Sequence, residues 1–282
     1  MADADLGPVP GLGFARPVSV HSLIHLEGDA ASEGSAPLAE EVPVAMVYNG
    51  RSHVVVMASP ADLDDLAVGF SVTEGIVSSA SEIRRVETVR HSRGVELHLS
   101  IPDAAAATLE ARRRALSART GCGLCGVEAI DDLVRDTPPV VAEFAMDPDA
   151  LWRAAAALED NQPVNRETRA VHGAAWATPD GALRVAREDV GRHNALDKVL
   201  GALFRAGTPP GTGFIVITSR ASYELVQKVA IARVPLLAAV SRPTTLAVKL
   251  SETLGVTLVA LLRGRSANVY AHGERLLPRA LA

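Results

Sequence analysis

Cysteine is nearly absent from this chain, which has only Cys122 and Cys125 in 282 residues. A disulfide framework belongs to small secreted domains with many cysteines, so none is expected here. The first residues, MADADLGPVPGLG, have neither the positive segment nor the apolar core of a secretory signal. The longest mostly apolar runs, such as Val256–Leu262, fall far short of the ~20 residues that span a bilayer. We therefore expect a soluble, cytoplasmic protein without membrane contact.

Positive charge is also scarce. The formal net charge is -5, and lysine occurs only at Lys198, Lys228 and Lys249. A general nucleic-acid binder needs a basic surface to displace counterions, so no nucleic-acid partner is expected. Arginine supplies most of the positive charge, and its planar guanidinium suits fixed phosphate or carboxylate contacts better than lysine does.

The N-terminal half divides into a tail and a small lobe. Residues 1–40 are rich in Ala, Gly, Pro, Ser and acidic residues and have no sustained hydrophobic period, which predicts a mobile tail. Ordered structure is predicted from residue 41, with a hairpin turning at Asn49-Gly50 and a helix capped by Ser59. A strand (VELHLSI) and a helix (DAAAATLEARRRALSAR) then lead into the cysteines. Residues 41–150 are thus expected to form an N-terminal α+β lobe that carries the Cys-x-x-Cys loop.

In residues 151–282 apolar strands alternate with helices. After a helix (DPDALWRAAAALED) and a hairpin turning at Pro179–Gly181, the strands GFIVITS, PLLAAVS and VTLVALLR each follow a helical segment. Such alternation indicates a sheet with parallel strands and helices on both faces. The predicted fold class is therefore α/β, with a three-layer α/β/α core and a nucleotide or cofactor pocket in this second lobe.

The two cysteines stand in RTGCGLCG, and their role is open among four readings. Free cysteine often behaves as a small buried hydrophobe, although the surrounding glycines describe a loop. A zinc site needs more ligands than one Cys-x-x-Cys provides, and no matching pattern of histidines or acids accompanies it. A thioredoxin-like dithiol follows a strand, whereas this pair follows a helical run. The fourth reading is a persulfide carrier, which needs an exposed and mobile cysteine that is largely in its thiolate form. Nearby arginines favour the thiolate because they lower the pKa of the thiol.

Polar residues stand at three successive starts of helices in the second lobe. The segment REDVGRHNALDKVLG contains Arg192, His193 and Asn194 beside Asp189, Asp197 and Lys198, and TSRASYE and SRPTTLA follow the next strands. Helix N-termini bind anions, and ligands of open α/β sheets sit where the strands end. Asp189, His193 and Lys198 are open to two readings, as acid-base groups or as capping and ion-pairing residues. The proposed anion-binding residues at these junctions are Arg192, His193, Asn194, Ser219, Arg220, Ser241, Arg242 and Thr244.

Five segments together resemble a known family. TGCGLCG, REDVGRHNALDKVLG, TSRASYELVQKVA, SRPTTLAVKLSETLG and LLRGRSANVYAHGERL are similar, in order, to the FdhD/NarQ family of formate dehydrogenase accessory sulfurtransferases. The similarity extends from about Val42 to Leu277. Five long matches in order are far more specific than one Cys-x-x-Cys.

The resemblance implies a sulfur carrier that takes sulfur from a cysteine desulfurase. It would deliver this sulfur to the molybdenum bis(molybdopterin guanine dinucleotide) cofactor before the cofactor enters the formate dehydrogenase catalytic subunit. It also implies a homodimer and a cytidine-deaminase-like core without the deaminase zinc. Cys122 would carry the persulfide and Cys125 would be its partner. The segment against the cofactor would comprise Leu261, Leu262, Arg263, Gly264, Arg265 and Ser266.

The cofactor is a bound substrate in this interpretation, and its guanine nucleotides make GDP an expected analogue. The main alternative is a nonenzymatic chaperone that only binds the molybdenum cofactor and docks the apoenzyme. A zinc-dependent deaminase is a third alternative, which metal analysis of the purified protein separates from the others.

Overall fold

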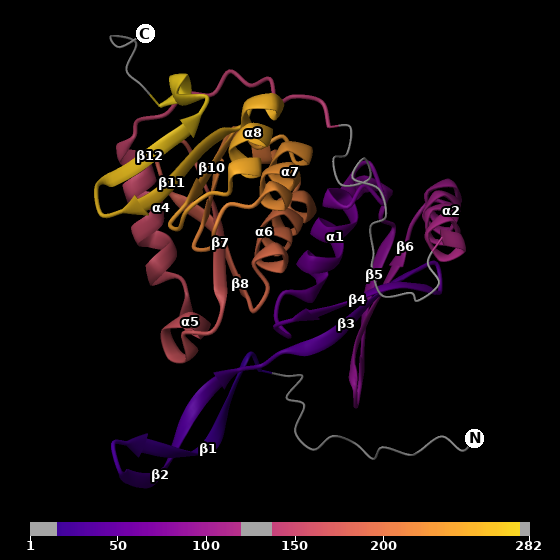
Figure 1. The fold of residues 1–282 in the computed structure, drawn as a ribbon. Coiled ribbons are helices and arrows are strands. Elements are labelled where there is room, and N and C mark those ends of the chain that lie inside the picture. The colour runs from indigo at the N-terminus through magenta and orange to yellow at the C-terminus, as the bar shows by residue number, and fades with distance from the viewer. Residues whose placement is uncertain (1–15, 120–136, 277–282) are drawn as a thin grey trace, which may run out of the picture.

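A computed structural model describes residues 16–119 and 137–276. The N-terminal lobe contains a four-stranded sheet in the order β4-β3-β6-β5, with β3 and β6 parallel at its centre. Helices α1 and α2 lie beside this sheet (Figure 1), and their apolar residues pack against its buried side chains. The elements of this lobe are β3 (Val42–Tyr48), β4 (Arg51–Ala58), α1 (Leu63–Thr73), β5 (Arg85–His91), β6 (Gly94–Ser100) and α2 (Asp103–Arg119).

The larger lobe contains a six-stranded sheet in the order β12-β11-β10-β9-β7-β8. Strands β9, β10 and β11 are parallel, and the others are antiparallel to their neighbours. The strands are β7 (His172–Ala177), β8 (Leu183–Asp189), β9 (Phe214–Ile217), β10 (Leu236–Ala239), β11 (Thr257–Arg263) and β12 (Ser266–Ala271). The helices are α4 (Asp149–Asp160), α5 (Pro163–Thr168), α6 (Arg192–Arg205), α7 (Tyr223–Ile231) and α8 (Thr245–Leu254).

Two separate cores confirm the predicted α/β/α layering. Apolar residues of α6, α7 and α8 form one core against the sheet, and those of α4 form a second core on the other face. The predicted smaller α+β lobe is also present. Both predicted hairpin turns form, with Asn49, Gly50 and Gly181 at positive φ of 47°, 79° and 83°. No helix in the described part of the chain is long and apolar enough to cross a membrane.

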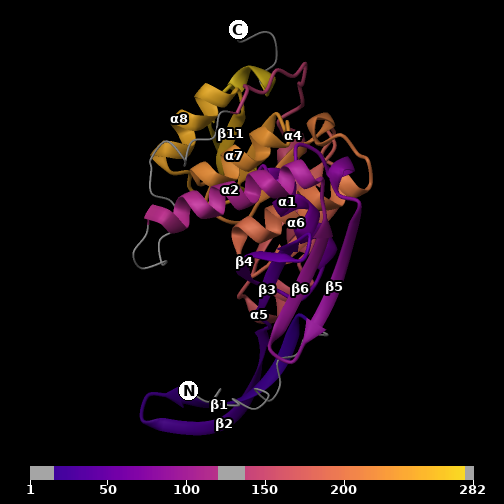
Figure 2. The ribbon, with the colours of Figure 1, turned by 90° about the vertical axis from the view of Figure 1, so that its right-hand side faces the viewer.

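The segment 1–40, predicted to be a mobile tail, contains a β-hairpin over residues 18–39 that the sequence analysis did not predict. Strands β1 (Val18–Glu27) and β2 (Ala30–Ala39) pair along their whole length as an antiparallel hairpin. Its two-residue turn is Gly28-Asp29, with Gly28 at φ 59°. Glycine and aspartate are residues that such turns favour. Both views show the hairpin extending away from the two lobes (Figures 1 and 2), so most of its side chains are exposed and lack the burial pattern that marks a core strand.

Two other boundaries also need correction. Helix α1 begins at Leu63 after Asp62, which is left-handed, so Ser59 is not its cap. Ser59 instead accepts a hydrogen bond from the Val190 backbone, and its own backbone N–H donates to Asp189. The predicted boundary between the lobes, near residue 150, lies too far toward the C-terminus, because Val140 already packs in a core of the larger lobe.

The two lobes are joined chiefly by α1 and α6, which lie side by side in both views (Figures 1 and 2). Glycines permit this close approach. A Cβ on Gly69 would lie 1.8 Å from the Asp197 carbonyl oxygen, and a Cβ on Gly201 would lie 1.8 Å from that of Asp65. The backbones of the two helices therefore touch with no room for a side chain between them.

We expect Gly201→Ala to lower the free energy of unfolding by about 3 kcal/mol, since the helices must separate to admit one methyl group. Alanine is the better helix former by about 1 kcal/mol, so the contact outweighs the intrinsic preference. Gly34→Ala is the control, because its Cβ would make only ordinary contact with Leu23. Chemical denaturation measures both. Equal stability of the Gly201→Ala protein and the wild type would contradict the close packing.

Candidate functional site

The predicted polar junctions converge at one edge of the six-stranded sheet, which we call the carboxyl edge. It comprises the residues that follow β9, β10 and β11 together with the start of α6. Because these strands are parallel, their carboxyl ends meet at the same edge. The Leu261 N–H donates to the Ser241 carbonyl at 3.1 Å, and the Thr244 N–H donates to Ala221 at 3.0 Å. The sequence-predicted junctions are thus neighbours in space.

Arg192 and His193 begin α6 and face this edge. The His193 Nε2 lies 2.5 Å from the Glu224 carboxylate, and an Arg192 Nη lies 3.9 Å from the same carboxylate. The Arg192 Nε is buried and has no hydrogen-bond partner among the described residues. Burial lowers the pKa of His193, although Glu224 opposes this, and the positive charges of Arg192 and Lys228 lower it further. The neutral imidazole of His193 is therefore favoured, and Arg192 and Glu224 supply the charges beside the start of the helix.

The other junction residues divide by exposure. Arg220 and Arg242 are exposed, whereas Ser219 is buried and its hydroxyl donates to the Arg220 carbonyl at 3.2 Å. The Thr244 hydroxyl accepts a hydrogen bond from the Ala247 N–H and so caps α8. The two arginines are therefore available to a ligand, while Ser219 and Thr244 shape the backbone.

The segment 261–266 forms the tip of the β11–β12 hairpin. Leu261 adopts φ 57° within an irregularity of the strand pairing, and Gly264 turns the chain at φ 54°. Leu262 is buried in the core beneath α4, so its side chain is not presented to a ligand. Arg263 and Ser266 are exposed, as is Arg265, which pairs with Asp149 at 2.6 Å.

Other polar residues of REDVGRHNALDKVLG turn inward. The buried Asp189 carboxylate accepts hydrogen bonds from the backbone of Ser59 and Gly191 at 3.0 and 2.8 Å, and from the Asn194 amide at 3.0 Å. The Nζ of Lys198, also fully buried, lies 2.6 Å from the same carboxylate. For Asp189 and Lys198 the structure favours the ion-pairing interpretation over acid-base chemistry. Asn194 also donates to the Met57 carbonyl at 2.8 Å, so it fixes the helix start to the N-terminal lobe.

A second buried cluster lies where the lobes meet. Lys228 Nζ is 2.8 Å from both the Asp197 and the Glu74 carboxylates and donates to the Thr73 hydroxyl at 2.9 Å. Burial raises the pKa of Asp197. Burial disfavours the ammonium of Lys228, but the neighbouring carboxylates of Asp197 and Glu74 outweigh it and raise the pKa of this lysine. The motif residues Asp197 and Lys228 thus join the lobes from within.

Sequence reasoning missed His172, the first residue of β7. It pairs in register with Asp189, and the next residue, Gly173, exchanges hydrogen bonds with Thr218 at the carboxyl edge. Burial lowers the pKa of His172, and the nearby Arg192 and Arg220 lower it further, with Asp189 opposing. A single histidine before an apolar run carries no signal in sequence, because its position depends on the pairing of β7 with β8.

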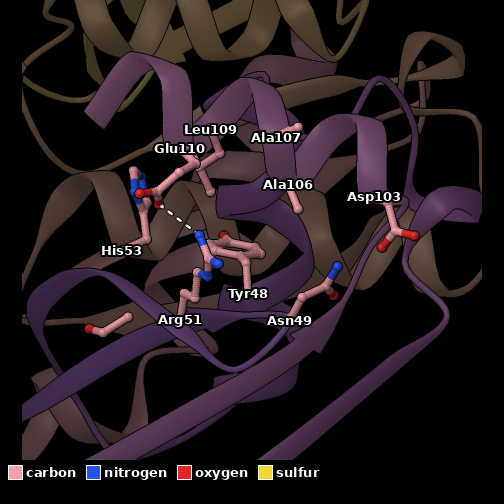
Figure 3. Close-up of a pocket in the computed structure, with 10 residues that line it drawn as sticks. Tyr48, Asn49, Arg51, His53, Asp103, Ala106, Ala107, Leu109 and Glu110 are labelled. Atoms are coloured by element: carbon pink, nitrogen blue, oxygen red, sulfur yellow. Dashed lines mark ion pairs between the residues drawn. The ribbon is translucent and has the colours of Figure 1, made fainter. Parts of the chain in front are cut away.

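Cys122 and Cys125 lie outside the described residues, which end at Arg119 before them. Helix α2 leads toward them, and its first half packs on the N-terminal lobe through Ala105, Ala106 and Leu109. Beside this half is a hollow of about 380 Å³ (Figure 3), where Arg51 pairs with Glu110 at 3.7 Å and the ring of Tyr48 meets His53. These contacts anchor the start of α2 to the β3–β4 turn.

The arrangement at the carboxyl edge is able to bind an anion. The N-terminus of α6, the half-buried Arg192 and the exposed Arg220 and Arg242 lie at this edge, and phosphate groups bind well to such positions. In the described residues, no group of three or more His, Cys, Asp or Glu side chains is placed to hold a metal ion. Fold and site together define an α/β protein with polar strand-to-helix junctions gathered at one sheet edge and a smaller α+β lobe whose last helix precedes the Cys-x-x-Cys segment.

Comparison with known proteins then identifies the family. The model of the FdhD/NarQ family matches residues 39–277, and the chain belongs to this family. It is 48% identical over 269 residues to the sulfur carrier protein FdhD of Xanthomonas euvesicatoria pv. vesicatoria, covering 95% of each chain. It is 47% identical over 252 residues to that of Agrobacterium fabrum, covering 89% of this chain and 93% of the relative.

A solved structure shares the fold. The crystal structure of a formate dehydrogenase accessory protein from Desulfotalea psychrophila superposes with a TM-score of 0.72 at 24% identity. The superposition covers 93% of this chain and all of the other. The family match and the two relatives confirm the resemblance read from the five motifs.

The lowered pKa values of His172 and His193 predict a pH-dependent stability. The unfolded chain binds these protons near pH 6.5 and the folded chain binds them only at lower pH, so the free energy of unfolding falls as the pH drops below about 6.5. We therefore expect the wild-type protein to be less stable at about pH 5.5 than at about pH 7.5. Urea denaturation at both pH values measures it.

The variant His172→Gln/His193→Gln should lose this part of the pH dependence. His25→Gln, on the exposed β1 strand, serves as the control and should keep the wild-type slope. An unchanged slope in the double variant would show that other groups cause the acid sensitivity.

Proposed function

We propose that this protein is a persulfide sulfurtransferase that matures formate dehydrogenase. It accepts sulfur from a cysteine desulfurase and transfers it to the molybdenum bis(molybdopterin guanine dinucleotide) cofactor, which it binds as a substrate. The observation that carries the proposal is the family match over residues 39–277, with relatives named sulfur carrier protein FdhD. The proposal places the reaction in the cytoplasm, in a homodimer, with the formate dehydrogenase catalytic subunit as the recipient of the cofactor.

The proposed sulfur chemistry uses both thiols. The Cys122 thiolate takes the terminal sulfur of the desulfurase persulfide, and the desulfurase cysteine leaves as a thiolate. Cys125 then attacks the Sγ of Cys122, which forms a disulfide and releases the sulfane sulfur to the cofactor as hydrosulfide. A cellular dithiol reduces the disulfide and restores both thiols, as the reducing poise of the cytosol permits.

The carboxyl edge supports the proposed nucleotide site. Guanine dinucleotides carry pyrophosphates, which suit the N-terminus of α6 and the arginines at positions 192, 220 and 242. The buried Arg192 Nε without a partner among the described residues is a donor that an anion satisfies. Arg263 adds positive charge at the neighbouring β11–β12 tip.

Mass spectrometry after incubation with a cysteine desulfurase and cysteine tests the sulfur chemistry. The wild-type protein should gain roughly 32 Da, the mass of one sulfur on a thiol. Cys122→Ala should abolish both this adduct and formate dehydrogenase maturation. Cys125→Ala should retain the adduct on Cys122 but release it slowly.

Full maturation by the Cys122→Ala protein would overturn the sulfurtransferase and leave a cofactor-binding chaperone. An adduct found only on Cys125 would exchange the roles of the two cysteines. Stoichiometric zinc that is lost on mutation of Cys122 would instead support the deaminase-like alternative.

Calorimetry with GDP tests the nucleotide site. We expect GDP to bind and ATP to bind much more weakly. Arg220→Gln and Arg242→Gln should each weaken GDP binding at least about tenfold, because each removes a charge-assisted contact with phosphate. Arg184→Gln is the control, since Arg184 is also exposed but lies near the opposite end of β8. Unchanged affinity in both junction variants would place the nucleotide elsewhere.

A further inference from the structure

Helices α6 and α7 begin near each other at the carboxyl edge, and one carboxylate joins their starts. Glu224 is the second residue of α7 and the acidic residue of its first turn. Its carboxylate lies 2.5 Å from the His193 Nε2 and 3.9 Å from an Arg192 Nη, and both of these residues belong to the first turn of α6. An acidic side chain in a first turn stabilises its own helix. That role alone does not account for the contacts with a second helix.

A carboxylate at this position is chemically similar to a bound anion. The same arginine, imidazole and helix N-terminus bind a phosphate oxygen as well as a carboxylate oxygen. The carboxylate leaves part of the site unused, because the Arg192 Nε and the Ser222 Oγ are buried and have no hydrogen-bond partner among the described residues. Ser222 directly precedes α7, two positions before Glu224. A phosphate group presents more acceptor oxygens than one carboxylate, so it is able to satisfy donors that Glu224 leaves unpartnered.

Glu224 also removes the net charge beside the start of α6. Among the described residues it is the only acidic side chain in ion-pair contact with Arg192 or His193. Burial lowers the pKa of His193, which favours its neutral imidazole, so the charges of Arg192 and Glu224 cancel. Nearby Lys228 already contacts two carboxylates of its own. The attraction of this helix start for an anion therefore depends on where the Glu224 carboxylate lies.

We propose that Glu224 is an internal counterion that a phosphate group of the ligand displaces from Arg192 and His193. The Glu224 side chain is 41% exposed, so its carboxylate is able to turn into solvent when the ligand binds. Only molecules in which it has turned away are competent to bind, which raises the apparent dissociation constant above the intrinsic one. The inference rests on the proposed nucleotide site and names the residue that limits its affinity. Such a limit suits a carrier, because a carrier must release the cofactor to the enzyme that it matures.

Calorimetry with GDP and with inorganic pyrophosphate, on the purified full-length protein, tests the counterion. Glu224→Gln keeps the shape of the side chain but removes its charge, so both ligands should bind at least about fivefold more tightly than they bind the wild type. Glu252→Gln is the matched control, because Glu252 is exposed in the last turn of α8, at the opposite end from the helix starts of the carboxyl edge. It removes the same charge and should change either dissociation constant by less than about twofold.

The structure of the complex separates displacement from simple repulsion. In crystals grown with pyrophosphate, phosphate oxygens should lie within hydrogen-bond distance of Arg192, and the Glu224 carboxylate should no longer contact His193. A bound pyrophosphate beside an unmoved Glu224 carboxylate would overturn the inference.

Three calorimetric results would also overturn it. Unchanged affinity in the Glu224→Gln protein would leave the proposed nucleotide site intact but remove the counterion, and weaker binding would make Glu224 a residue that positions Arg192 and His193. Equal gains in the Glu224→Gln and Glu252→Gln proteins would assign the effect to net charge. If neither the wild type nor the Glu224→Gln protein binds either ligand, the nucleotide site itself fails together with the inference. Circular dichroism confirms that each variant is folded.

Discussion

The buried Asp189 carboxylate is the group on which the arrangement of this protein most depends. Burial of a charge is costly unless it is paired and fully hydrogen-bonded. Here the carboxylate meets the Lys198 ammonium, two backbone N–H groups and the Asn194 amide, and one of those N–H groups, that of Ser59, belongs to the N-terminal lobe. The same carboxylate thus fixes the turn into α6 and attaches the smaller lobe to it.

This anchoring separates the polar residues of one motif into two groups. Asp189, Asn194 and Lys198 satisfy one another inside, which leaves Arg192 and His193 at the surface without competing carboxylates except Glu224. An anion-binding edge needs such a division, because an arginine already paired within the fold has little affinity left for a phosphate. The inward-facing residues therefore contribute to the proposed site indirectly. Because the Asp189 carboxylate pairs with Lys198 inside the fold, it does not neutralise Arg192.

Hydrophobic period was sufficient to predict the layered core and the positions of α6, α7 and α8, and turn residues were sufficient to predict the two tight turns. It was not sufficient for the β1–β2 hairpin, because an exposed hairpin has no core-facing pattern and only the Gly28-Asp29 turn marked it. Nor did it assign Asp189 and Lys198, since a catalytic pair and a structural pair use the same residue types. Their roles became clear only when the 2.6 Å contact and complete burial were known.

The joint between the lobes has a consequence for the parts of the molecule that the proposed function uses. The N-terminal lobe bears α2, which precedes the cysteines in the sequence, whereas the larger lobe bears the carboxyl edge. Two features fix the position of one lobe against the other. The glycines of α1 and α6 bring the two helix backbones into contact, and Lys228 forms a buried cluster with Asp197 and Glu74. Closure by movement of whole lobes would expose these charges and break the helix contact at high cost. The described parts of the two lobes therefore keep a fixed relation, which holds the start of α2 and the carboxyl edge at constant positions.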